Sequence, residues 1–569
     1  MVILEKILAV SRGEKKADLI FRNGRVVNVF SGEILQVDVV VCGNTIAAVG
    51  DGYVKGHEVM DLKGAYLIPG LIDAHVHVES SMLTPAGFAR AVLSHGTTTV
   101  IADPHEIANA AGLRGLDFMV NSSRGAPVDF FFMVPSCVPA TGMETAGAYL
   151  GAEETQKAFE MLHDSPGLGE MMNFPGVLFR DKEVISKIKM ALEMGRVVDG
   201  HAPSLTGKDL NAYVSAGISS DHECVSSGEA LEKIRLGMKV IIREGSAAKD
   251  LDALLPAVNE KNFTEFMFGC DDRHPAHLLE NGEIDDILRK AVRKGLDPVN
   301  AVRMATINPA RHYGLKGRGA VAPGYKADLV VVRDLKDFDV LEVYKDGRMV
   351  AKEGRILESS PQYHDPQLED SVRIPDLRGR FSLEPPAQGA IANVITVKAG
   401  QIITGWEKVP FYGIGGDDDL AKAAVIERYS GKGGMSLGLV RGFGLKSGAI
   451  ASTIAHDSHN LIVIGVSDED MEMATRAAAE MGGGLVVVLD KEVRASLPLP
   501  VGGLMSYEDA AGVAAGHKKT EAAAVALGCS LPSPFMTLSF LALPVIPALK
   551  LTDRGLFDVK SFSHISLWD

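Results

Sequence analysis

The chain has 569 residues, of which 46% are hydrophobic and 23% charged, so it is long enough for several domains and too apolar to be largely disordered. Its formal net charge of -15 argues against a nucleic-acid groove or an anionic membrane surface as partner. Five scattered cysteines without a CxxC pair indicate a reducing compartment and disfavour a thiolate zinc site. Since the N-terminus does not resemble a secretory signal and no apolar stretch spans a bilayer comfortably, we expect a cytoplasmic protein.

The N-terminal segment reads as short strands separated by Gly and Asn, and a similar pattern returns over residues 326–350. The echo of ADLIFRNGRVVNV in ADLVVV and YKDGRMV suggests that both pieces belong to one β domain, split by an insertion. We therefore expect the first part of a flanking β domain at 1–69 and its second part at 316–360.

The insertion at 70–315 alternates strand-like and helix-like stretches. Eight βα units in about 250 residues are the expected size of a (β/α)8 barrel, in which catalytic groups lie at the C-terminal ends of the strands. The strands expected after the first, which carries His75 and His77, cover residues 98–102, 129–134, 167–171, 197–200, 217–221, 239–243 and 265–270.

A polar, proline-containing stretch at 361–380 predicts a linker, followed at 381–569 by a C-terminal α/β or α+β domain with apolar strands. The expected fold class is therefore α/β: a TIM-like (β/α)8 barrel with a split flanking β-sandwich and an additional C-terminal domain.

The segment 69–79, PGLIDAHVHVE, ends in two histidines at i and i+2. On a strand such residues point to the same face, so His75 and His77 can reach one metal ion. A bare HxH is also compatible with two ordinary histidines at a strand end, so the prediction depends on further ligands downstream.

Such ligands appear at the ends of the predicted strands in barrel order. They are Glu170 on strand four, His201 after strand five, His222 after strand six and Asp271 after strand eight. Each has an ordinary alternative, such as a surface acid, a helix cap or a hydrogen-bonded loop residue, but so many coincidences in this order are improbable.

Two metal ions fit six ligands better than one, because a mononuclear hydrolytic site usually needs three protein ligands and a water. The two oxygens of Glu170 can bridge a pair of ions, with His201 and His222 on the second ion. Ions about 3.5–4 Å apart can share a hydroxide and make it available as a nucleophile at neutral pH. A thiol-free shell of imidazoles and carboxylates suits Mn²⁺, Fe²⁺ or Zn²⁺.

These residues, with LIPGLIDAHVHVES and KADLVVV, resemble the amidohydrolase superfamily, many of whose hydrolases place a carboxylated lysine at strand four. Here that position is Glu170. A narrower resemblance is to the bacterial adenine deaminase family, through AHVHVESSMLTP, HGTTTVIADPHEIAN, PSCVPAT, GEMMNFPGV, DGHAP, SSDHE, CDDRHP and, near the C-terminus, IASTIAHDSHNLIVIG.

That resemblance runs over essentially the whole chain and implies a hydrolase of purine salvage. It implies hydrolytic deamination of adenine to hypoxanthine and ammonia by a metal-bound hydroxide that attacks C6, with a binuclear iron or manganese centre in a barrel. Zinc remains possible, and we expect a homo-oligomer, most simply a dimer. Its partners are the small molecules adenine and water, with no nucleic acid or membrane.

Roles beyond the metal ligands can also be assigned. Asp271 is the preferred proton shuttle and Glu170 the bridging ligand, while the adjacent acid Asp272 is the rival of Asp271 and a candidate substrate contact. In the loop after strand three, Asp103, His105 and Glu106 are candidates for binding or protonating the purine, although Asp103 and Glu106 also fit a helix cap and capping box. Ser80 and Ser81 either contact the base or cap the next helix, and His456–Asn460 either covers the site, binds a further ion or forms a polar turn.

Two alternatives remain at this stage. One is another metal-dependent amidohydrolase that acts on a cyclic amide or a different aminopurine. The other is a catalytically dead scaffold, whose expected mark, the loss of metal ligands, is not seen in the sequence.

Overall fold

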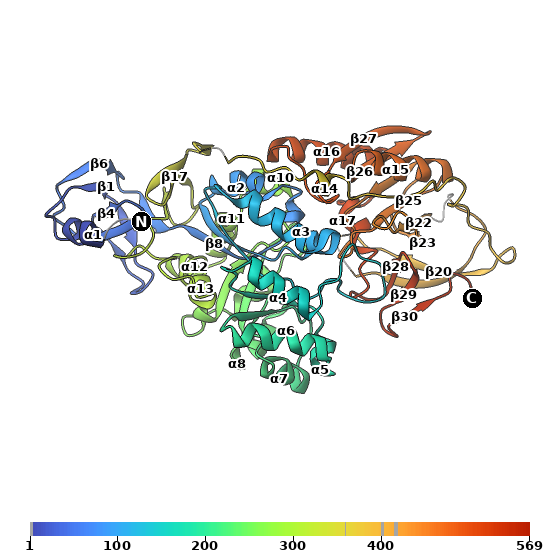
Figure 1. The fold of residues 1–569 in the computed structure, drawn as a ribbon, viewed down its shortest axis with the longest axis horizontal. Helices are drawn as coiled ribbons and strands as arrows, with labels where there is room; N and C mark the ends of the chain where they lie inside the picture. Colours follow the sequence, from blue (N-terminus) through green and yellow to red (C-terminus); the bar gives the residue numbers. More distant parts are fainter. Residues whose placement is uncertain (1–3, 359, 400–402, 415–418) are drawn as a thin grey trace.

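The structure is a computed structural model that describes residues 4–358, 360–399, 403–414 and 419–569. Three regions follow one another along the long axis of the molecule: N-terminal sheets, a middle region of strands and helices, and a C-terminal region (Figure 1). In the part of the chain that is described, no helix has the length and apolar character needed to cross a membrane.

Two sheets form the region at the N-terminal end. Their strands are β1 (Ala17–Arg22), β2 (Arg25–Val27), β3 (Ile34–Leu35), β4 (Val39–Cys42), β5 (Thr45–Val49), β6 (Gly56–Asp61), β7 (Tyr66–Pro69), β16 (Leu329–Val332), β17 (Val340–Lys345), β18 (Arg348–Lys352) and β19 (Arg355–Ile356). One sheet has the order β5-β4-β1-β6 and the other β19-β18-β17-β16-β7-β2-β3. Strands from before and after the middle region therefore share the second sheet, in which Leu329 of β16 lies opposite Pro69 of β7.

The aromatic rings of Phe21 and Tyr344 show how the two sheets pack. They meet edge to face at 4.8 Å between centroids, in an apolar cluster that draws on both sheets. Since alternate residues of a strand face opposite sides, Leu19 and Phe21 lie in this cluster, whereas Ile20 lies in a second apolar cluster with Val10 of the N-terminal helix.

Eight parallel strands form the middle region. They are β8 (Leu71–Val76), β9 (Thr97–Ala102), β10 (Asp129–Phe132), β11 (Gly167–Met171), β12 (Val197–Gly200), β13 (Ser220–Asp221), β14 (Lys239–Arg243) and β15 (Phe266–Gly269). They pair in parallel as three sheets, β8-β9-β10, β11-β12 and β13-β14-β15. Every residue of β8 and β9 is buried, as expected for strands covered on both faces.

Single contacts connect these three sheets to one another. Val134 bridges to Leu168 between the first and second sheets, and the backbone N–H of Ser219 donates to the carbonyl of Val198 between the second and third. Val76 bridges to Asp271 between the third sheet and the first. The ends of the first and last strands are therefore neighbours.

Helices follow the strands and carry their own start signals. Thr84 caps α2 by accepting a hydrogen bond from the N–H of Gly87, and Asp181 caps α6 through the N–H groups of Glu183 and Val184. The helices of the N-terminal and middle regions are α1 (Leu4–Ser11), η1 (Val78–Ser81), α2 (Pro85–Leu93), α3 (His105–Ser123), α4 (Ala152–Met161), α5 (Phe174–Leu178), α6 (Lys182–Glu193), α7 (Gly207–Ser215), α8 (Ser227–Arg235), α9 (Leu251–Leu254), η2 (Leu255–Ala257), η3 (Phe263–Glu265), α10 (Pro275–Asn281), α11 (Ile284–Arg293), α12 (Pro298–Met304) and α13 (Ile307–His312).

The C-terminal region is built on an eight-stranded sheet of order β21-β20-β23-β22-β25-β24-β26-β27. Its elements are α14 (Pro366–Glu369), β20 (Ile391–Thr396), β21 (Gly405–Pro410), β22 (Leu420–Ile426), β23 (Met435–Arg441), β24 (Ala449–Ser452), β25 (Leu461–Gly465), α15 (Asp468–Glu480), β26 (Gly484–Leu489), β27 (Glu492–Pro498), α16 (Ala510–Ala526), α17 (Pro534–Phe540), β28 (Leu549–Thr552), β29 (Gly555–Asp558) and β30 (Ser563–Ile565). Alternate residues of its central strands face different cores, with Ala449 in the cluster that includes Met471 of α15 and Ile450 in the cluster that includes Val513 of α16.

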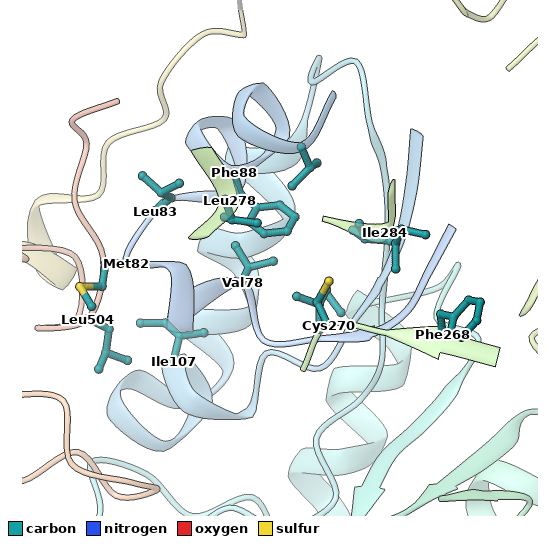
Figure 2. Packing of buried hydrophobic residues seen from close by; sticks show 14 of the residues in the cluster. Val78, Met82, Leu83, Phe88, Ile107, Phe268, Cys270, Leu278, Ile284 and Leu504 are labelled. Carbon is teal, nitrogen blue, oxygen red and sulfur yellow. The ribbon is translucent and has the colours of Figure 1, made fainter. Parts of the chain in front are cut away.

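The C-terminal region is packed tightly against the middle region. Leu504 belongs to the same buried apolar cluster as Met82 and Ile107 (Figure 2). The N–H of Ser506 donates to the carbonyl of Met82 at 2.8 Å. A Cβ added to Gly502, whose φ is +65°, would lie 2.3 Å from Cδ1 of Ile107, so glycine is required for this close approach.

Candidate functional site

The two histidines of the HxH pair lie where β8 ends, and their rings meet edge to face at 4.8 Å between centroids. The Nδ1 of His77 is 2.9 Å from the carbonyl oxygen of Asp103, so Nδ1 carries a proton and Nε2 is the nitrogen that a metal ion could use. The Nε2 of His75 is buried and has no hydrogen-bond partner among the residues that the structure describes. One nitrogen of each imidazole therefore lies in the interior of the protein, and that of His77 is 3.2 Å from both Glu170 and Asp271.

Glu170, on β11, lies among four imidazoles. Its Oε1 is 3.2 Å from Nε2 of His77 and 3.3 Å from Nδ1 of His105. Its Oε2 is 2.6 Å from Nδ1 of His201 and 3.1 Å from Nε2 of His222. Burial opposes ionisation, but the neighbouring His222 and His201 hold the pKa of Glu170 well below its usual range, so the side chain is a carboxylate. A carboxylate in this position has one oxygen for each pair of histidines.

The backbone around Glu170 is fixed by two polar contacts. Its N–H donates to Oδ2 of Asp103 at 2.9 Å, and its carbonyl accepts a hydrogen bond from the hydroxyl of Ser136. The preceding residue has to be small, because a Cβ on Gly169 would lie 2.1 Å from Oδ2 of Asp103.

Asp271 follows β15 and faces the same histidines. Its Oδ1 is 3.2 Å from Nε2 of His77 and 3.7 Å from Nε2 of His75, while Oδ2 is 3.1 Å from Nη1 of Arg243. Despite burial, these partners hold the pKa of Asp271 well below its ordinary value. Its φ of +56° is uncommon for a non-glycine residue, and backbone hydrogen bonds to both His75 and His77 hold it there.

The loops that carry His201 and His222 are tied together by Asp221. The carboxylate of Asp221 accepts hydrogen bonds from the N–H of Ala202 at 2.8 Å and from the buried ammonium of Lys233 at 2.9 Å. Burial would raise the pKa of Asp221, but Lys233 lowers it to about 2. The carboxylate of Glu170 likewise outweighs burial and raises the pKa of His222 to about 9.

These residues fit a divalent metal site. Donor atoms of His75, His77 and Glu170 lie within 4.8 Å of one another, as do those of His75, His222 and Asp271 and those of Glu170, His201 and His222. The set combines two anionic carboxylates with four imidazoles and contains no thiol, a chemistry that suits zinc, iron or manganese. The unpartnered Nε2 of His75 is the kind of buried polar atom that a metal ion satisfies.

A second group of acids lies beside this cluster. The hydroxyl of Ser80 is 2.9 Å from Oε1 of Glu106 and also hydrogen-bonds Oδ1 of Asp272. Oε1 of Glu79 accepts from the N–H of Ile107, and its other oxygen is buried without a hydrogen-bond partner in the described ranges of the chain. Burial raises the pKa of Glu106 and of Asp272; the charge of Asp272 raises that of Glu106 further, and the charge of Asp271 raises that of Asp272. This group therefore favours carboxyl groups that hold a proton.

Other residues predicted for the site differ in their surroundings. Asp103 does not cap α3, since its Oδ2 accepts from Glu170 and its Oδ1 is 3.8 Å from Nδ1 of His105. Although burial opposes it, Asp103 and Glu170 raise the pKa of His105 to about 10. The hydroxyl of Ser81 donates to the carbonyl of Val78 in its own turn, so it faces away from the acids that Ser80 contacts.

The sequence reasoning missed three charged residues. Glu79 is two residues after His77, and Glu223 directly follows His222, with its Oε1 3.5 Å from Nε2 of that histidine. Arg243 is the last residue of β14 and pairs with both Glu223 and Asp271. Their signals were present, because Glu79 continues the HxH alternation and Arg243 lies at a strand end, the position from which the other ligands were identified.

The segment His456–Asn460 lies between β24 and β25 and is buried against α3. The Nδ1 of His456 is 3.6 Å from Oε1 of Glu106, and Nε2 of His459 is 3.8 Å from Oε2 of the same residue. The C-terminal region therefore reaches the group of acids in the middle region.

Comparisons with known proteins agree over the whole chain. Residues 66–350 match the amidohydrolase family, and residues 401–563 match the adenine deaminase C-terminal domain. Adenine deaminases of Desulfatibacillum aliphaticivorans and Dehalococcoides mccartyi strain 195 are each 47% identical to it, covering 100% of both chains and 99% of both chains, respectively. Among solved structures, atrazine chlorohydrolase of Arthrobacter aurescens TC1 matches 60% of this chain and 97% of its own, with 17% identity and a TM-score of 0.47.

Proposed function

The chain belongs to the adenine deaminases of the amidohydrolase family, and we propose that His75, His77, Glu170, His201, His222 and Asp271 are the ligands of its catalytic metal centre. It is an enzyme that deaminates adenine by hydrolysis, yielding hypoxanthine and ammonia. The observation that carries the proposal is the position of Glu170, whose Oε1 faces His77 while its Oε2 faces His201 and His222.

The fold that positions these residues is of the mixed α/β amidohydrolase type. We infer that its eight parallel strands close into a (β/α)8 barrel, because single contacts between Val134 and Leu168 and between Val76 and Asp271 join neighbouring sheets. All six ligands then lie at the C-terminal ends of strands, the catalytic face of such barrels. For the whole chain we propose flanking segments at 1–69 and 316–360, a barrel at 70–315, a linker at 361–380 and a C-terminal domain at 381–569.

Two divalent ions are the metal content that this donor set supports best. His75, His77 and Asp271 would hold one ion, His201 and His222 the other, and Glu170 would bridge them. Mn²⁺ or Fe²⁺ is our proposal, and Zn²⁺ suits the same donors. When bound, such ions supply Lewis acidity that lowers the pKa of a water and makes it a nucleophile at neutral pH.

Side chains of the protein then transfer the protons that the hydrolysis requires. Hydrolysis adds water across C6 of adenine and breaks the bond to the amino group, which leaves well only as ammonia. We assign Asp271 to accept a proton of the attacking water and return it to the departing nitrogen, because Asp271 is a carboxylate beside the histidine cluster. Arg243, on its other oxygen, keeps this carboxylate oriented.

Glu106 is the group that we assign to the purine ring. A hydroxyl has a single proton, yet that of Ser80 contacts both Glu106 and Asp272. One of the two carboxyl groups must therefore donate to Ser80 and be protonated, in agreement with their raised pKa values. Glu106 can donate such a proton to a ring nitrogen of the purine. This stabilises the negative charge that develops on the ring when C6 is attacked. Asp103 and His105 act through Glu170, one on its backbone and one on its carboxylate.

An assay of ammonia release tests the substrate assignment. The purified protein, grown in medium supplemented with Mn²⁺ or Fe²⁺, should release ammonia from adenine and produce hypoxanthine. Guanine, cytosine and a hydantoin ring serve as comparison substrates. Activity on one of these rings and none on adenine would replace the assignment by another amidohydrolase reaction, whereas inactivity on all rings with full metal content would favour a scaffold.

Homodimerisation and a cytoplasmic location are further proposals that follow from the sequence expectations. Light scattering of the purified protein measures the first, and cell fractionation measures the second.

A further inference from the structure

The loop between β24 and β25 places two imidazoles beside Glu106, the acid that we assign to the purine ring. His456 and His459 face the two oxygens of Glu106 at 3.6 and 3.8 Å, and all three side chains are at least 94% buried. We propose that His459 is a positioning residue for Glu106, so that the C-terminal region completes the active site. This inference rests on the proposed function of Glu106.

The tautomer of His459 favours this role over metal binding. The N–H of Ala455 donates to Nδ1 of His459 at 3.2 Å, so Nδ1 is an acceptor and the proton of the neutral ring is on Nε2. Burial lowers the pKa of His459 well below its ordinary value, so the ring is neutral. Histidines that bind a metal normally donate from their second nitrogen, which an amide N–H on Nδ1 prevents here.

The Nε2–H of His459 is thereby directed at Glu106. It has no hydrogen-bond partner in the described part of the chain, and Oε2 of Glu106 lies 3.8 Å away. Because Oε1 of Glu106 is bonded to Ser80, a donor on Oε2 would fix the carboxyl group at both ends. A shift of less than 1 Å turns the 3.8 Å contact into a hydrogen bond, and contacts in active sites commonly tighten when substrate binds.

The backbone of the loop is held from several sides. Arg428, which is fully buried, donates from Nε to the carbonyl of His459 and from Nη2 to the carbonyl of Gly502. The hydroxyl of Tyr429 donates to the carbonyl of Ser458 at 2.5 Å. His459 has a φ of +50°, an uncommon conformation for histidine that these contacts maintain. The ring is therefore presented to Glu106 by a rigid support, as a positioning role requires.

Three substitutions at residue 459 separate the possible roles. In His459→Gln the terminal amide can occupy the position of Nε2 and donate to Glu106. In His459→Asn the shorter amide can replace only Nδ1, and His459→Leu replaces neither nitrogen. His517→Gln is the matched control, because His517 is equally buried in the C-terminal region and belongs to no part of the proposed catalytic machinery.

Adenine turnover, metal content and thermal midpoint are measured for the full-length, metal-loaded variants. We expect His459→Leu and His459→Asn to lose roughly 10- to 100-fold in kcat, the usual loss for an outer partner of a catalytic group. We expect His459→Gln and His517→Gln to stay near wild type, with two metal ions per chain in every variant.

Other outcomes overturn the inference. Activity retained by His459→Asn but lost by His459→Gln would mean that only the Nδ1 contact within the loop matters. Loss of a third metal ion in all three variants at residue 459 would make His459 a ligand, and wild-type turnover in His459→Leu would remove any role. If the wild-type protein itself releases no ammonia from adenine, the proposed function fails. This result differs from the outcomes above, in all of which the wild-type protein is active.

Discussion

Two groups of residues in the site are built in different ways. One is the strand-end cluster of six ligand candidates, His75, His77, Glu170, His201, His222 and Asp271, and the other is the group of acids Glu79, Glu106 and Asp272. Each ligand candidate of the cluster belongs to a parallel strand or follows it within two residues, so neighbouring strand ends bring them together. The acids and their partners come instead from η1, α3, the loop after β15 and the segment between β24 and β25. The cluster thus follows from the ends of strands within one region, whereas the acids depend on how two regions of the chain pack.

Glu170→Gln tests the cluster and should have the largest effect. The amide keeps the shape of the side chain but removes the charge that faces four imidazoles. We expect loss of metal together with a fall in turnover beyond the roughly 10²–10⁴-fold that a single proton-transfer group supplies. Metal analysis and the adenine assay on the same preparation measure both, and a fully metallated, fully active variant would refute the bridging role.

Asp271→Asn separates the cluster from the acids. The variant should keep the fold and much of the metal, because the other five ligand candidates remain, yet turnover should fall roughly 10²–10⁴-fold. Asp272→Asn is the control, with unchanged metal content and a smaller loss. Near-normal activity of Asp271→Asn would transfer the proton shuttle to Asp272.

Asp221→Asn tests, by its effect on the free energy of unfolding, the ion pair that supports the loops of His201 and His222. It leaves the buried ammonium of Lys233 with Glu229 as its remaining carboxylate, at 2.9 Å, and should lower the free energy of unfolding by about 3 kcal/mol at neutral pH. Because the folded-state pKa of Asp221 is lowered to about 2, its contribution is complete above the unfolded value of about 3.9 and is lost as the pH falls toward 2. Urea unfolding at several pH values should show a gap from wild type that narrows in this acidic window. A gap independent of pH would contradict this assignment.

Ser80→Ala and Ser81→Ala test two neighbouring serines, of which only Ser80 contacts the group of acids. Removing the hydroxyl of Ser80 takes away the group that hydrogen-bonds both Glu106 and Asp272, and we expect a roughly 10-fold loss of turnover, equivalent to about 1.5 kcal/mol for one hydrogen bond. The hydroxyl of Ser81 bonds within its own turn, so its loss should lower stability by about 1 kcal/mol and leave turnover within about threefold of wild type. Equal losses of turnover in both variants would argue against the proton-sharing role of Ser80.

The two regions also differ in how far the sequence predicts them. The strand ranges 167–171, 197–200 and 239–243 agree with β11, β12 and β14, and the HxH pair was identified from the alternation of a strand alone. Glu170 could be found because it is an acid in a buried strand. The strand β13 has two residues, whereas five were expected. Strand boundaries are therefore predicted less accurately where the strand contains polar residues.

The contact between Glu106 and His459 could not be derived in the same way. The two residues are separated by more than 350 positions, and no local pattern indicates which loop of one region covers which helix of another. Asp103 shows a related limit, since its spacing fitted a helix cap while its carboxylate bonds Glu170 instead. Local patterns predict elements and strand ends, and packing between regions decides the remaining partners.

The most direct test of the central claim is a metal titration of the apoprotein with ammonia release from adenine as the readout. Mn²⁺ or Fe²⁺ is added in steps to metal-free protein, and bound metal is measured beside activity. The cluster of six ligands predicts activity that rises with metal and saturates at two ions per chain. Full activity with one ion per chain, or without any added metal, would contradict it.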